Sequence, residues 1–174
     1  MTYTMITSSH NCDDGYIALV NLELINLPET ITIDTHLLTR TSEFHVSLMA
    51  LKHLAPIIDP DSPAEAMAQL VDDFVQFTKS TPLTTLELTS EFRLVRRADR
   101  VSVVVMVEVS GIDALFDALR TKYGPTLPMQ PTHITLYTLQ PNTGIGLFST
   151  DEVARDTRVV MIPELNDIKM KEIL

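Results

Sequence analysis

The sequence predicts a single domain of the α+β class, on two observations. Segments rich in aliphatic and β-branched residues, which favour strands, occur along most of the chain. Two further segments repeat their apolar residues at helical spacing. The 174 residues are enough for one full core but too few for two independent domains. We therefore expect one domain over residues 1–174, with residues 1–14 as a flexible N-terminal tail.

The first half is expected to contain strands followed by a helix. Residues 16–25 (YIALVNLELI) form a dense aliphatic run suited to a buried strand, residues 30–41 a short extended segment, and residues 43–51 (EFHVSLMAL) a second strand. Prolines 56, 60 and 63 should interrupt the chain after it. Ser62 is a plausible N-cap for a helix. The apolar positions expected on its buried face are Met67, Leu70, Val71, Phe74, Val75 and Phe77.

The second half of the sequence predicts a hairpin, a helix and a further strand. Residues 84–95 and 100–109 are strand-like and are joined by a polar turn, and the second of them (VSVVVMVEV) is apolar enough to lie mid-sheet. Residues 111–123 form an amphipathic helix, and residues 131–139 (PTHITLYTL) a strand. The remaining expectations are a strand over 144–148, a short helix over 149–155 and a strand over 158–162.

The charge balance argues against large polyanionic partners. Lysine and arginine number 13 against 23 acidic residues, a formal net charge of −10, so the overall field repels DNA, long RNA and anionic lipid surfaces. A small phosphate ester or a short RNA end fits this charge better. Only Cys12 is present, so neither an intramolecular disulfide nor a cysteine metal site is available. With no membrane-spanning run in the sequence, we expect a cytoplasmic protein.

Two of the predicted strands carry the same short motif. His45-Val46-Ser47-Leu48 and His133-Ile134-Thr135-Leu136 share a histidine, a β-branched residue, a hydroxyl residue and a leucine at identical spacing. On a strand, residues i and i+2 point to the same face about 7 Å apart, while the residues between them face the other side. Each motif therefore presents an imidazole and a hydroxyl together.

This set of groups suits the hydrolysis of a phosphodiester. One neutral histidine, His45 or His133, can take a proton from water, and the other, charged, can give one to the departing oxygen, so the chemistry needs no metal and no cofactor. Ser47 and Thr135 can donate hydrogen bonds to the non-bridging phosphate oxygens. The motifs are nearly symmetric, so both assignments of acid and base stay open. A catalytically idle module that binds a nucleotide, or a duplicated pair of strands with no site, would give the same pattern.

The chain resembles the 2H phosphoesterase superfamily in its LigT-like branch, named for 2′-5′ RNA ligase. The resemblance covers roughly residues 16–140 and rests on four segments, GYIALVNL, FHVSLMAL, EFRLVRRADRVSVVV and PTHITLYT, in the family's order. It implies a two-lobed, pseudo-twofold fold of antiparallel sheets with outer helices and a central cleft that holds both histidines. Ser47 stands where the family usually has threonine and retains the hydroxyl.

The resemblance also implies substrates and partners. The expected substrates are small nucleotides or RNA ends with a 2′,3′-cyclic phosphate, 2′-5′ linkages, or small cyclic nucleotides such as ADP-ribose 1″,2″-cyclic phosphate, with 2′-5′ RNA ligase activity as an accompanying reaction. We expect a monomer with no DNA or membrane partner.

Three further side chains are candidates for substrate contacts. Tyr137 follows His133 and Thr135 on the same strand face, so it either stacks on a base or hydrogen-bonds phosphate, or packs as a buried aromatic. Arg93 and Arg100 belong to a basic cluster with Arg96 and Arg97. That cluster either guides a phosphorylated substrate or is a solvated hairpin tip.

Overall fold

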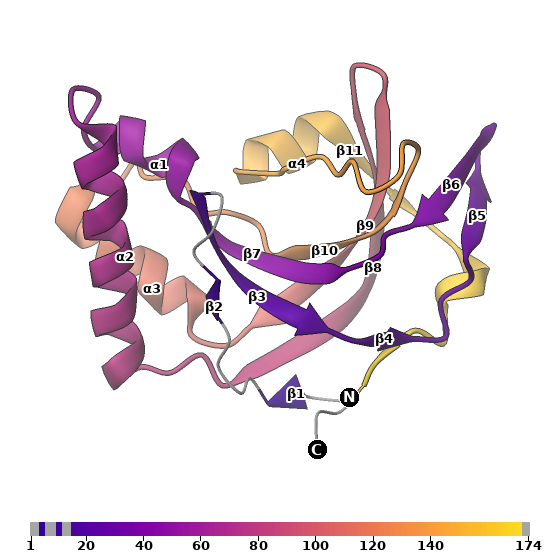
Figure 1. Cartoon of the computed structure of the whole chain (residues 1–174), viewed down its shortest axis with the longest axis horizontal. Coiled ribbons are helices and arrows are strands. Elements are labelled where there is room, and N and C mark those ends of the chain that lie inside the picture. Colours follow the sequence, from indigo (N-terminus) through magenta and orange to yellow (C-terminus); the bar gives the residue numbers. More distant parts are fainter. Residues whose placement is uncertain (1–3, 6–9, 12–14, 172–174) are drawn as a thin grey trace.

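The protein is a mixed α+β structure with antiparallel sheets (Figure 1). The computed structural model describes residues 4–5, 10–11 and 15–171, and the following elements belong to this part. In the first half these are β1 (Thr4–Met5), β2 (His10–Asn11), β3 (Tyr16–Leu22), β4 (Leu24–Ile25), β5 (Thr30–Ile33), β6 (His36–Arg40), β7 (Phe44–Ala50), α1 (Leu51–Ile58) and α2 (Pro63–Ser80). In the second half they are β8 (Thr85–Arg97), β9 (Arg100–Val109), α3 (Ile112–Tyr123), β10 (His133–Thr138), α4 (Thr150–Asp156), β11 (Thr157–Val160), a 3-10 helix (Pro163–Leu165) and β12 (Lys169–Met170).

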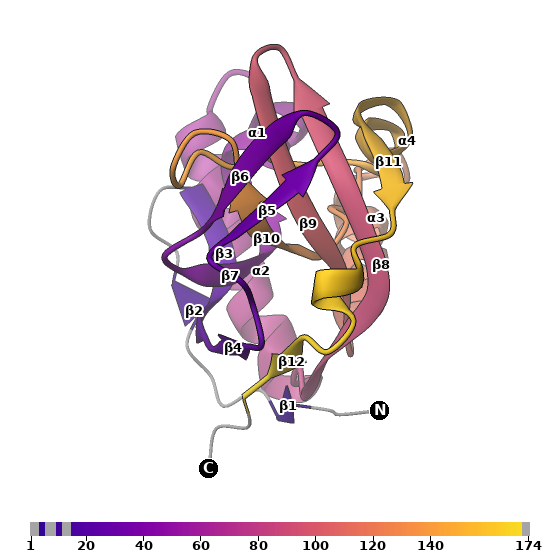
Figure 2. The ribbon, with the colours of Figure 1, turned by 90° about the vertical axis from the view of Figure 1, so that its right-hand side faces the viewer.

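The strands form one large sheet and two small ones. The large sheet has the order β1-β8-β9-β10-β6-β5, and β11 also pairs with β8. A three-stranded sheet has the order β2-β3-β7, and β12 pairs with β4. Strand β7 lies beside β10, so the two motif-bearing strands meet where the large and the three-stranded sheets approach each other (Figure 1). The long hairpin β8–β9 rises behind the β5–β6 hairpin (Figure 2).

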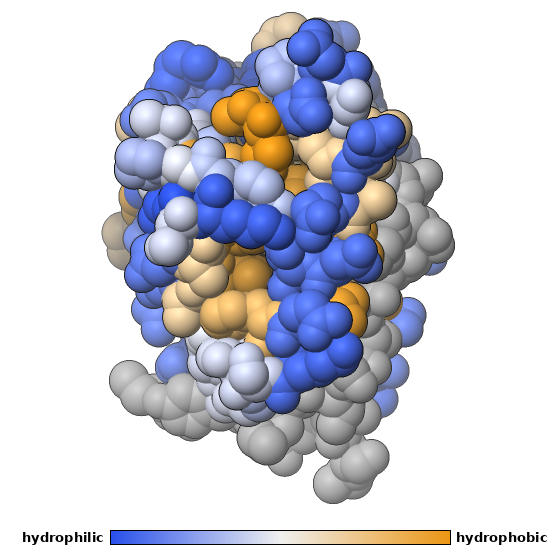
Figure 3. All heavy atoms as spheres, turned by 90° about the vertical axis from the view of Figure 1, so that its left-hand side faces the viewer, coloured by the Kyte–Doolittle hydropathy of each residue, from blue (hydrophilic) through white to orange (hydrophobic). Residues whose placement is uncertain are grey.

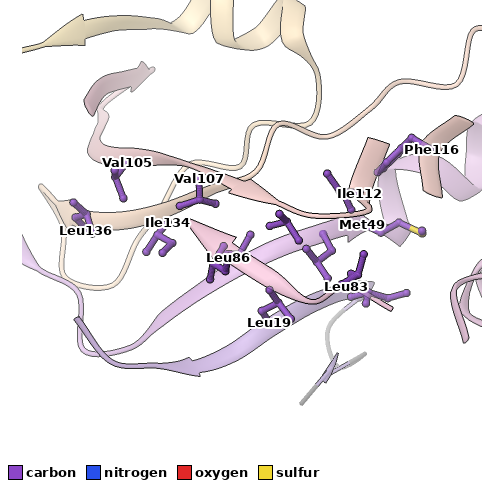
Figure 4. Packing of buried hydrophobic residues seen from close by; sticks show 14 of the residues in the cluster. Leu19, Met49, Leu83, Leu86, Val105, Val107, Ile112, Phe116, Ile134 and Leu136 are labelled. Atoms are coloured by element: carbon purple, nitrogen blue, oxygen red, sulfur yellow. The ribbon is translucent and has the colours of Figure 1, made fainter. Parts of the chain in front are cut away.

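The predicted mid-sheet position of β9 is confirmed. It is bonded on one side to β8 and on the other to β10, and Val103, Val104 and Val105 are fully buried. One face packs into the main core, where Val105 and Val107 lie near Ile134 and Leu136 (Figure 4). Helices α1, α2 and α3 gather at one end of the molecule (Figure 1). Seen from that side, the surface is mostly hydrophilic with small apolar areas (Figure 3).

The second face of β9 is covered by a loop rather than by another strand. The expected strand over 144–148 is wrong, because this segment has no strand pairing and instead places Ile145 and Leu147 against Val104 of β9. Two glycines in the segment favour strands poorly. Strand β9 is also already paired on both edges, by β8 and β10, so it offers no free edge.

Helix α1 was not predicted from the sequence. It runs through Pro56, which was expected to break the chain, and buries Leu51, Leu54 and Ala55 on one face. A proline costs a helix one hydrogen bond; here the burial of that apolar face offsets the loss. Helix α2 is confirmed, but Val75 is 43% exposed and the Ser62 hydroxyl makes no capping bond.

Part of the expected N-terminal tail is paired with the sheets. Thr4–Met5 pairs with β8 and His10–Asn11 with β3, while the other positions of residues 1–14 lie outside the described residues. Within the described part of the chain, no helix combines the length and apolarity that crossing a bilayer requires.

Candidate functional site

The two motifs lie on strands that alternate as predicted. On β7, His45 and Ser47 are at least partly exposed while Val46 and Leu48 are fully buried. On β10, Ile134 and Leu136 are fully buried. The β-branched and leucine residues therefore anchor each strand in the core, and the histidine and hydroxyl residues point to the other face.

Backbone and side-chain hydrogen bonds join β10 to the segment between β6 and β7. Just before β7, the backbone N–H of Thr41 donates to the Leu136 carbonyl (2.9 Å), and its hydroxyl donates to the Thr135 carbonyl (3.1 Å). Beside this junction lies a pocket of about 470 Å³. His45, Ser47, His133 and Thr135 all line it, so the structure brings the four motif side chains to one cavity.

One hydrogen bond sets the tautomer of His133. Its Nδ1 lies 2.9 Å from the Pro131 carbonyl oxygen, and a carbonyl can only accept, so Nδ1 carries a hydrogen and donates it. Nε2 is then the nitrogen left to take or release a proton. Burial lowers the pKa of His133; the Pro131 hydrogen bond opposes this shift, and the positive charge of His45 adds to it.

His45 has a different environment. Burial lowers its pKa as well, but the carboxylate of Glu43 opposes the shift. Glu43 lies two residues before His45 and also lines the pocket. A neighbouring negative charge favours the imidazolium and a neighbouring positive charge disfavours it, so the charges beside the two rings act in opposite directions on their pKa values.

Both motif hydroxyls are available to a ligand. No described residue forms a hydrogen bond with the side-chain oxygen of Ser47 or Thr135, and both side chains line the pocket. Gly144 leaves space beside one of them, since a Cβ placed there would lie 3.5 Å from Thr135 Oγ1.

Tyr137 does not lie in the pocket. The pairing of β10 with β9 shifts register between Thr135 and Tyr137, an irregularity that places Leu136 out of the ladder and reverses the alternation beyond it. Tyr137 is therefore fully buried in the main core, where its hydroxyl donates to the Pro28 carbonyl (2.8 Å). Of the two alternatives for Tyr137, the structure shows the packed aromatic.

The predicted basic cluster does not line the pocket either. Arg93 pairs with Glu91 and donates to Thr157, and Arg97 forms a short ion pair with Asp156. Arg100 donates to the Gly144 carbonyl (3.4 Å), and Arg97 donates to the Gly146 carbonyl (3.1 Å). These two arginines therefore hold the backbone of the pocket loop and do not line the cavity themselves.

The pocket includes residues that the sequence reasoning missed. Glu43 could have been found, because the alternation that groups His45 with Ser47 extends back by two residues. The others come from β3 and from irregular segments, where no periodicity marks them: Tyr16, Ala18, Val20, Thr41, Ser42, Gln130, Asn142, Gly144, Ile145, Gly146 and Phe148. The Phe148 ring stacks on His53 of α1 at 4.8 Å between ring centres.

The described residues contain no group of three or more histidine, cysteine, aspartate or glutamate side chains placed to hold a metal ion. In the comparisons with known proteins, no family model, no curated protein and no solved structure matched this chain.

Proposed function

We propose that this protein is a metal-independent phosphodiesterase of the 2H type that opens cyclic phosphodiesters at RNA ends or in small cyclic nucleotides. The observation that carries the proposal is that His45, Ser47, His133 and Thr135 line a single pocket. Two imidazoles with different charged neighbours supply an acid and a base, and two uncommitted hydroxyls supply donors for a phosphate.

In the proposed reaction His133 is the base and His45 the acid. Nε2 of neutral His133 takes a proton from water as the water oxygen bonds to phosphorus. The bond from phosphorus to one ribose oxygen breaks, and that oxygen receives the proton from His45. Ser47 and Thr135 donate to the non-bridging oxygens, where charge builds up. The product is a ribose 2′- or 3′-phosphomonoester.

The assignment of roles rests on the neighbours of each ring. His133 is 7% exposed and its Nδ1 is committed to a carbonyl, which fixes the orientation of the ring and leaves one titrating nitrogen. His45 lies beside the carboxylate of Glu43, which favours its charged form. The residue that gives up its proton more easily suits the base, and the other suits the acid.

The charge of the pocket favours a small substrate with a single negative charge. No lysine or arginine is found among the pocket-lining residues of the described chain, and Glu43 adds a negative charge. A cyclic diester carries one charge and its monoester product carries up to two, so this pocket should release the product readily. The net charge of −10 also disfavours long nucleic acids. We extend the proposal to the two-lobed 2H arrangement, to 2′-5′ RNA ligase activity and to a cytoplasmic monomer without cofactor.

The test is turnover of 2′,3′-cyclic nucleotides in the presence of excess chelator. We expect the wild type to form phosphomonoester, and His45→Ala and His133→Ala each to lose nearly all of it, since one acid or base group contributes about 10²–10⁴-fold. His36→Ala is the matched control, because His36 lies in the β5–β6 hairpin and does not line the pocket. Binding without product in the wild type would instead support an idle nucleotide-binding module.

A further inference from the structure

The Phe148 ring lies at the border of the pocket, with one face held by α1. Phe148 belongs to the loop between β10 and α4, is partly exposed and lines the pocket. The His53 ring stacks on it, with 4.8 Å between ring centres and 19° between ring planes. His53 itself does not line the pocket. The stacked face of Phe148 is therefore turned away from the cavity, and its other face and its edge are left to border it.

Two more contacts fix the position of this ring. The Phe148 N–H donates to the Glu152 carboxylate at 2.6 Å, and the Glu152 N–H donates to the Ser149 hydroxyl at 3.2 Å. The residues that cap α4 thus also fix the backbone of Phe148. The tip of the ring lies against Gly146, where a Cβ would come within 2.5 Å of it. Gly146 lines the pocket too, so the ring itself reaches the cavity wall.

An aromatic ring held in this way suits a flat ligand. Because its position is already fixed, the ring loses little conformational freedom when a ligand covers it. Stacking on an aromatic side chain favours every nucleobase, since each base has a π face. Ser47 and Thr135 in the same pocket suit the phosphate, so the base is the part of a nucleotide that is left for the ring.

Resting on the proposed function, we propose that the nucleobase of the substrate stacks on Phe148, and that Glu152 is a positioning residue that acts through Phe148. The stack selects nucleoside cyclic phosphates over cyclic diesters that lack a base. Arg97 supports the same wall, since its guanidinium lies 3.6 Å from the Glu152 carboxylate and donates to the Gly146 carbonyl.

The first test substitutes Phe148→Leu, which keeps an apolar side chain and removes the flat ring. The measurement is kcat/KM on the 2′,3′-cyclic phosphates of adenosine and uridine and on a base-free five-membered cyclic phosphodiester. We expect about a tenfold loss on the adenosine substrate, a smaller loss on the uridine substrate, whose base has less stacking surface, and less than a twofold change on the base-free diester. An equal loss on all three substrates, or no loss on any, would overturn the inference.

Phe77→Leu is the matched control. Phe77 lies in α2, packs against the main core and does not line the pocket. The same change there should lower Tm and leave the ratio of kcat/KM between the adenosine substrate and the base-free diester at its wild-type value. A fall in this ratio as large as that in Phe148→Leu would assign the effect to lost stability and overturn the inference.

The second test concerns Glu152. Glu152→Met removes the acceptor of the Phe148 N–H, whereas Glu152→Gln keeps one. We expect Glu152→Met to raise KM for the adenosine substrate with little change in kcat, and Glu152→Gln to stay near the wild type. Because Glu152 acts through Phe148, the double variant should be no worse than Phe148→Leu alone. Losses that add up in the double variant would refute the positioning role.

The two proposals can fail separately. If the wild type turns over none of the three diesters, the proposed function fails, and NMR titrations with adenosine and with inorganic phosphate then test the ring. Adenosine binding that weakens about tenfold in Phe148→Leu, with phosphate binding unchanged, supports the stack. No adenosine binding in the wild type, equal binding in both proteins, or an equal loss for both ligands refutes it.

Discussion

Replacing Tyr137 by phenylalanine should weaken the fold and leave catalysis unchanged. The Tyr137 side chain is fully buried and its hydroxyl donates to the Pro28 carbonyl at 2.8 Å. The variant loses this one hydrogen bond and leaves the carbonyl without its partner, which costs about 1 kcal/mol of unfolding free energy. For a chain of this size, that corresponds to a decrease in Tm of about 2–4 °C.

The measurement is urea unfolding together with kcat/KM on a 2′,3′-cyclic nucleotide, both at pH 7. Burial raises the pKa of Tyr137 to about 12. Its contribution is therefore fully present below the unfolded value near 10 and is lost only as the pH rises through 12, so titration does not affect the comparison. Tyr16→Phe is the control, since Tyr16 lines the pocket and its hydroxyl bonds to no described residue. A tenfold fall in the kcat/KM of Tyr137→Phe with unchanged unfolding would refute the placement of Tyr137 in the core.

Three more predictions concern the pocket. Because burial lowers the pKa of His45, kcat/KM should fall as the pH rises through a value below 6.5. Glu43→Gln removes the neighbouring negative charge and should move this fall in kcat/KM to lower pH. An unchanged pH profile would mean that Glu43 does not raise the pKa of His45. Ser47→Ala and Thr135→Val should each lower single-turnover rates by about 10²-fold, and wild-type rates in both would remove the hydroxyls from the mechanism. Gly144→Ala should reduce kcat with little change in unfolding free energy, since its Cβ would lie 3.5 Å from Thr135 Oγ1; undiminished kcat would mean that a phosphate does not use this space.

The residue pattern predicted the elements that depend on local alternation and helical spacing. Strands β7 and β10 carry buried aliphatic residues at every second position, and this alternation alone places each histidine beside its hydroxyl. Helices α2 and α3 follow equally from their apolar spacing. The joint presence of both motifs in one pocket depends on how the sheets meet, which is a long-range property.

The errors arise where tertiary contacts override the local pattern. One irregular position in β10 turns Tyr137 into the core, and alternation cannot reveal it. The arginines of β8 and β9 looked like candidates for anion binding because the sequence does not show the carboxylates and carbonyls that face them. Helix α1 does not follow from the sequence because Pro56 indicates a break, whereas in the structure the helix continues through it and buries Leu51 and Leu54.

The loop between β10 and α4 combines two tasks at neighbouring positions. Ile145 and Leu147 pack against β9, and Gly144, Ile145, Gly146 and Phe148 border the cavity. Arginine side chains donate to the carbonyls of both glycines. Because this wall belongs to no sheet ladder, its cavity-facing positions can be exchanged without disturbing strand register. Gly146 is the exception, since a Cβ there would lie 2.5 Å from the Phe148 ring. Laboratory selection for new substrates should therefore accumulate changes at residues 144 and 148 while 145 and 147 stay aliphatic.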